Sequence, residues 1–113
     1  MFHCHCRDCQ RSSGGPFASF LAVPKAEFNL VKGELRFYAS PSKAGGDTRR
    51  GFCADCGSPI LGYPDAAPDL AAIRSGSLDE PENFEPKMDV WISDAHVWDH
   101  MNPTLPKFDF YPV

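Results

Sequence analysis

The chain has 113 residues, with 11 Lys and Arg against 15 Asp and Glu, which gives a formal net charge of −4. This length suits one domain with a modest core, and the negative charge argues against a nucleic-acid-binding protein, whose affinity depends on neutralising phosphates. No apolar run reaches the length of a membrane span, about 18 residues, and no secretory signal is present, so the sequence predicts a cytoplasmic protein.

The chain is punctuated by 11 prolines and 9 glycines, and the short stretches between them are rich in aromatic and β-branched residues. This pattern predicts a small all-β domain. The expected strands are residues 17–23, 35–40, 49–53, 59–63, 70–76 and 88–93. Helix is expected only as short turns at 6–13 and 93–101, and 40–48 is expected to be a loop with little to bury.

The five cysteines fall into two clusters. An odd number cannot all be paired in disulfides, and clustered cysteines in a reducing compartment more often bind metal or do redox chemistry than form disulfides. In "CHCRDC", Cys4 and Cys6 leave the same face of an extended chain, and Cys9 follows at C-x-x-C spacing. Three converging thiolates predict a zinc site that keeps its fourth position for water or substrate.

The second cluster, Cys53 and Cys56 in "FCADCGSP", has the form of a metal-binding knuckle, with Gly57 permitting the tight turn. It supplies two ligands, whereas a closed zinc site takes four. A redox pair is the first alternative, but it belongs at a strand-to-helix junction of a βαβ unit, which is not predicted here. Inert buried thiols are the second, and they would not be expected at ligand spacing twice.

The histidines near these clusters are expected to have structural roles. His3 and His5 alternate with the cysteines, so on a strand they face away from the metal, at the surface or the edge of the core. A fourth ligand or a proton shuttle is the alternative. His96 and His100 have the i, i+4 spacing of a metal pair on a helix, but a turn is preferred, with Trp98 packed on the core and the histidines in solvent.

Three segments, "HCHCRDCQRSSG", "FCADCGSPI" and "WDHMNPTLPKFDFYP", together resemble the glutathione-dependent formaldehyde-activating family. That family also includes centromere protein V, and its fold is similar to the Mss4-like β-tent. The resemblance covers nearly the whole chain and implies a single zinc domain over residues 1–113.

The resemblance also implies a set of metal ligands. In the family the C-x-C-x-x-C sulfurs, here Cys4, Cys6 and Cys9, hold the zinc regarded as catalytic. The C-x-x-C sulfurs, here Cys53 and Cys56, join an N-terminal C-x-C to hold a structural zinc. That C-x-C strand would precede Met1, so we expect a chain truncated at its N-terminus or a site completed differently, for example by sulfurs of the first cluster.

The activity that the resemblance implies is the addition of glutathione to formaldehyde, giving S-hydroxymethylglutathione, or the reverse carbon–sulfur lyase reaction. By charge alone, the candidate partners of the two glutathione carboxylates are Arg7, Arg11, Arg49 and Arg50. The alternative is a non-catalytic, zinc-stabilised binding module of the centromere protein V or Mss4-like type. An open zinc position beside a pocket would favour the enzyme, and a fully sulfur-ligated zinc with a flat apolar face would favour the module.

Overall fold

A computed structural model describes residues 1–112, and the chain divides into two compact units. Unit 1 combines Met1–Phe20 with Leu78–Val113, and unit 2 is Leu21–Ser77. Within the described residues the strands form one seven-stranded sheet in the order β3-β4-β5-β6-β2-β1-β7, which confirms the predicted all-β class. No helix in this part of the chain is long and apolar enough to cross a membrane.

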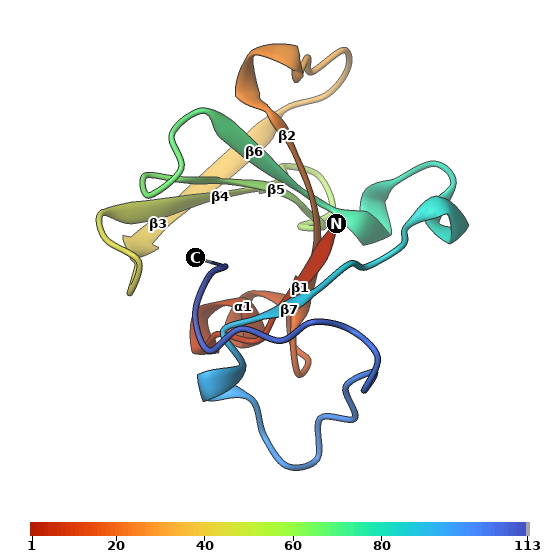
Figure 1. Ribbon diagram of the computed structural model, residues 1–113. Helices are drawn as coiled ribbons and strands as arrows, with labels where there is room; N and C mark the ends of the chain where they lie inside the picture. Colours follow the sequence, from red (N-terminus) through yellow and green to blue (C-terminus); the bar gives the residue numbers. More distant parts are fainter. Residues whose placement is uncertain (113) are drawn as a thin grey trace. The chain divides into compact units, whose positions relative to one another are not determined.

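Unit 2 is built from successive antiparallel hairpins, in which β3, β4, β5 and β6 lie side by side (Figure 1). Their bounds are Leu35–Pro41, Asp47–Cys53, Pro59–Pro64 and Leu70–Arg74, with short 3-10 turns at Lys25–Glu27 and Ser75–Ser77. Leu61 and Ala71 are buried between the strands. Gly51 allows Phe37 of the neighbouring strand to approach, because a Cβ at Gly51 would lie 2.9 Å from its ring.

Unit 1 holds the short elements around the first cysteine cluster. They are β1 (Phe2–Cys4), α1 (Arg7–Ser13), β7 (Asp89–Val90) and 3-10 turns at Pro81–Asn83 and Ile92–Asp94, while β2 (Ala18–Pro24) continues from unit 1 into unit 2. β1 pairs antiparallel with β2, Cys4 opposite Ala18, and parallel with β7, Cys4 opposite Val90. These pairings place Cys4 between two neighbouring strands in the buried part of the unit.

Most of the predicted strands are confirmed, but the predicted strand 88–93 is wrong beyond Val90. Trp91 has φ 58 and ψ 38, a left-handed conformation that ends the strand, and a 3-10 turn follows. The helical turn expected at 93–101 is limited to the end of that 3-10 turn, Ile92–Asp94. Trp98 is 58% exposed, so the expectation that it packs on the core is wrong.

Candidate metal centre

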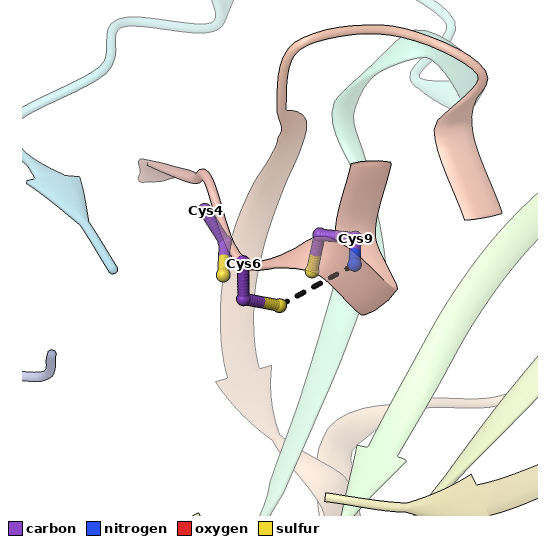
Figure 2. A group of neighbouring side chains, drawn as sticks. All are labelled: Cys4, Cys6 and Cys9. Carbon is purple, nitrogen blue, oxygen red and sulfur yellow. Dashed lines mark hydrogen bonds between the residues drawn. The ribbon is translucent and has the colours of Figure 1, made fainter. Parts of the chain in front are cut away.

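The three cysteines of "CHCRDC" come together at the junction of β1 and α1. Cys4 ends β1, Cys6 is extended with φ −63 and ψ 155 and caps α1, and Cys9 lies in the first turn of α1. Their sulfurs lie within 4.8 Å of one another, and Figure 2 shows the three side chains converging. Cys4 and Cys9 are buried, and Cys6 is half-buried. The predicted convergence is therefore confirmed.

The donor set fits a zinc ion. A tetrahedral zinc with Zn–S bonds of about 2.3 Å places its sulfurs roughly 3.8 Å apart, which is inside the spread of this cluster. Thiolate ligands also select soft ions such as zinc over the harder calcium or magnesium. Cys4, Cys6 and Cys9 are thus close enough to bind one metal ion.

Hydrogen bonds within the cluster distribute its charge unequally. The pKa of Cys6 is lowered because the thiols of Cys4 and Cys9 and the backbone N–H of Cys9 hydrogen-bond to its sulfur, the last at 3.3 Å. The pKa of Cys4 is raised by its hydrogen bonds to Cys6 and Cys9 and by burial. Without metal the pKa of Cys6 therefore lies below that of Cys4, and thiol ligands lose their protons on binding metal.

His5, between the first two cysteines, is fully buried and does not point at the sulfurs. Its Nε2 lies 2.9 Å from Asp89 Oδ1 and its Nδ1 lies 2.5 Å from Asp99 Oδ2. Lys107 donates from Nζ to Asp89 Oδ2 at 3.0 Å. Burial pushes the pKa of Asp89 upward, but the hydrogen bonds from His5 and Lys107 outweigh it and the pKa is lowered. These partners could not be predicted from the local sequence around His5, because they lie 84 and 94 residues away.

Gln10 is a second polar residue whose contacts the sequence motifs do not predict. Its side chain is buried on α1, where its amide donates to the carbonyls of His5, at 2.7 Å, and Asp94, at 3.1 Å. Its Oε1 accepts from Arg7 and, at 2.8 Å, from Nε2 of His96. Gln10 thus connects the cysteine loop to the segment that follows β7, a long-range contact with no local sequence signal.

Tyr111 is a third such residue. Its ring packs edge-on against Trp91 with 5.8 Å between the ring centroids. Burial and the charge of the neighbouring Cys4, Cys9 and Cys6 side chains raise the pKa of Tyr111 to about 12. The phenol therefore keeps its proton at neutral pH.

The four arginines proposed to bind carboxylates have different surroundings. Arg7 and Arg11 lie on α1, the helix that carries Cys9, and Arg49 and Arg50 lie on β4 of unit 2. Arg11 pairs with Asp8 at 3.3 Å, Arg50 donates to Ser40 at 3.1 Å, and the Arg49 guanidinium lies 5.4 Å from the Tyr63 ring centroid. Arg7 contacts Gln10 and lies 3.5 Å from His96 Nε2, both uncharged or weakly basic partners.

Cys53 and Cys56 form a turn at the end of β4 in unit 2. The Gly57 N–H donates to the Cys53 carbonyl at 2.9 Å, and Gly57 has φ 76, a conformation that favours glycine. The Cys56 sulfur is exposed and lies 3.1 Å from the Ser58 hydroxyl. Hydrogen bonds from Ser58 lower the pKa of Cys56, with a further contribution from Cys53. The turn brings the Cys53 and Cys56 thiols close together, and their role as metal ligands stays a prediction.

Comparison with known proteins adds one finding to this geometry. Residues 1–94 match the sequence model of a family described as "Glutathione-dependent formaldehyde-activating enzyme". No curated protein matches the chain. The matched region contains all five cysteines and Gln10, whereas Asp99, Lys107 and Tyr111 lie beyond it.

Proposed function

The chain belongs to the glutathione-dependent formaldehyde-activating family, and on that basis we propose that it forms or cleaves S-hydroxymethylglutathione at a zinc ion held by Cys4, Cys6 and Cys9. The observation that carries this proposal is the convergence of these three sulfurs, all from one short segment inside the matched region. The residues Cys53 and Cys56 are proposed as ligands of a second, structural metal. Their exposed turn supplies only part of such a site.

The reaction needs no oxidant or reductant. In the forward direction a carbon–sulfur bond forms between the thiol sulfur of glutathione and the carbonyl carbon of formaldehyde, and the thiol proton ends on the oxygen. Zinc with three protein ligands keeps a position for water or substrate and, when bound, would supply a Lewis acid for the thiol or the carbonyl oxygen.

Arg7 is the arginine best placed to bind a carboxylate of glutathione. It is exposed, it lies on α1 two residues before Cys9, and among the described residues its guanidinium contacts only the uncharged Gln10 side chain and His96. Arg11, by contrast, already pairs with Asp8. A charge-assisted bond from Arg7 would orient the thiol end of the substrate toward the cluster.

The proposal is tested by metal content and by S-hydroxymethylglutathione formation, followed by NMR with isotopically labelled formaldehyde. We expect about one zinc at the first cluster, lost in Cys6→Ser, together with turnover by the parent protein. Zinc at this cluster without turnover would favour the non-catalytic binding module. The absence of zinc from Cys4, Cys6 and Cys9 would overturn the catalytic proposal.

The role of Arg7 is tested by comparing Arg7→Ala with Arg11→Ala, a matched change on the same helix. Loss of one charge-assisted hydrogen bond should lower kcat/KM for glutathione about 10-fold or more in Arg7→Ala. Arg11→Ala should retain the parent value, since Arg11 is paired with Asp8. Equal effects of the two changes would rule out a specific role for Arg7.

A further inference from the structure

His5 occupies the one position between two of the metal-ligand cysteines, Cys4 and Cys6, and every polar group of this residue is engaged. The backbone N–H donates to the Val90 carbonyl at 3.0 Å, and the backbone carbonyl accepts from the Gln10 amide at 2.7 Å. The two ring nitrogens lie against Asp89 and Asp99. The peptide that joins Cys4 to Cys6 therefore cannot rotate without breaking contacts to β7, α1 and the Asp99 turn.

The two carboxylate partners of His5 are held in different ways. Asp89 lies on β7 and its second oxygen accepts from Lys107 at 3.0 Å. Lys107 also donates to the carbonyls of Asn102, at 2.6 Å, and Leu105, at 3.3 Å. Asp99 is buried, its own N–H donates to the His96 carbonyl at 3.0 Å, and its Oδ1 has no hydrogen-bond partner among the described residues. The ring of His5 thus lies between a carboxylate anchored by Lys107 and a carboxylate whose backbone is held in a turn.

The largely buried network of His5, Asp89, Asp99 and Lys107 contributes less to stability than apolar side chains of similar volume often would. Desolvating two carboxylates and a histidine costs free energy that packed apolar side chains would not, and we attribute the retention of this network to the geometry that it imposes. The geometry imposed here is the spacing of Cys4 and Cys6, because the histidine lies between them in the chain. Groups that hold ligand residues in place commonly tune metal affinity in this way.

We propose that His5, held by Asp89 and Asp99, is a positioning residue that sets the separation of the Cys4 and Cys6 sulfurs for metal binding. The proposal rests on the proposed function in taking these cysteines as ligands. It goes beyond that function in assigning a role to Asp99 and Lys107, which lie outside the region matched by the family. Asp89, Asp99 and Lys107 thus support His5 and, through it, the segment that joins Cys4 to Cys6. Asp99 and Lys107 come from the C-terminal segment.

The test uses the full chain loaded with cobalt, whose visible absorption reports the number and geometry of thiolate ligands. His5→Gln and the nearly isosteric Asp99→Asn should retain the parent far-ultraviolet circular dichroism. Both should show altered cobalt charge-transfer and d–d bands, and zinc affinity measured against a competing chelator should fall about 10- to 100-fold. Leu61→Ala, a core change in unit 2, is the control: it should lower the thermal midpoint while leaving the cobalt spectrum and the zinc affinity unchanged.

The outcomes separate this inference from the proposed function. A parent protein that shows no cobalt–thiolate bands would overturn the proposed metal site, and this inference with it. Parent bands together with unchanged bands and affinity in both variants would overturn the positioning role alone. If His5→Gln does not fold, Asp99→Asn carries the test, since it nearly retains the side-chain volume while removing the charge and replacing one acceptor oxygen with an NH2 donor.

Discussion

Asp89 shows how one buried carboxylate can make the stability of this protein depend on pH. Its pKa is lowered in the folded state, because hydrogen bonds from His5 and Lys107 outweigh the effect of burial. A lowered folded-state pKa means that the stabilisation is fully present above the ordinary Asp value of about 4, and is lost as the pH falls through the folded-state pKa. We therefore expect the free energy of unfolding to decline as the pH drops below about 4.

This prediction is checked by urea denaturation of metal-free, reduced parent and Asp89→Asn proteins across the acid range, so that the titration of Cys6, which both proteins share, cancels in the comparison. The pH dependence should be weaker in Asp89→Asn than in the parent. Parallel pH profiles for the parent and Asp89→Asn would show that Asp89 does not carry the effect.

Lys107→Met should lower the free energy of unfolding by about 1.5–3 kcal/mol near neutral pH, measured by the same urea denaturation, because it removes a hydrogen bond to a buried charge.

At the residue scale, the sequence predicted those contacts that are local. The convergence of Cys4, Cys6 and Cys9 follows from spacing within six residues of chain. The alternation of side chains along a strand also predicted that His5 faces away from the sulfurs. It could not indicate the buried aspartates, Asp89 and Asp99, that contact the His5 ring. Such partners are selected by packing between distant segments, and nothing in the local pattern around Asp99 distinguishes it from a solvent-exposed aspartate.

Among the elements, α1 depends on its two caps. Cys6 caps the N-terminus by accepting from the Cys9 N–H, and Gly14 ends the helix with φ 76, its N–H bonded to the Gln10 carbonyl at 2.8 Å. A side chain at position 14 meets no atom within 4 Å, so the cost of a substitution there is conformational. The left-handed conformation costs a residue with a Cβ about 1–2 kcal/mol.

Gly14→Ala should therefore lower the free energy of unfolding by about 1–2 kcal/mol, measured by chemical denaturation. Gly15→Ala is the matched control. Gly15 also has open space around its Cβ position but lacks the left-handed conformation, so the change should be neutral or slightly stabilising. A loss of the same size in both variants would show that the C-cap of α1 is not what the substitution disrupts.

The strands of the unit 2 hairpins could be predicted from the sequence, whereas the segment after Val90 could not. Strands β3 to β6 follow short apolar runs separated by turn residues, and their observed bounds agree with the predicted ranges to within about two residues. The predicted strand 88–93 failed because Trp91 adopts a left-handed conformation, which an aromatic residue rarely does. Its ring packs against Phe110, with 5.0 Å between the ring centroids, so tertiary packing overrides a local preference.

At the scale of the whole molecule, the two units differ in how far their cores depend on the cysteines. The buried apolar residues of unit 1 are Cys4, Cys9, Ala18, Phe20, Val90 and Trp91, and those of unit 2 are Leu61 and Ala71. Two proposed metal ligands are therefore part of the core of unit 1. The ligand pair of unit 2 lies outside its core, with Cys56 exposed.

Metal removal should consequently loosen the two units unequally. The proposed ligands lie in β1 (Cys4), at the N-cap of α1 (Cys6) and in α1 (Cys9), so a bound metal would hold these elements together, and binding free energy at such sites is also folding free energy. After chelation, amide hydrogen exchange should accelerate in β1, α1 and β7, while β5 and β6 keep their protection.

Cys6→Ser should show the accelerated exchange before chelator is added and little further change in unit 1 afterwards. Faster exchange confined to residues 53–58 would instead locate the metal at the knuckle, and equal acceleration in both units would show that the core of unit 1 has no special dependence on its cysteines.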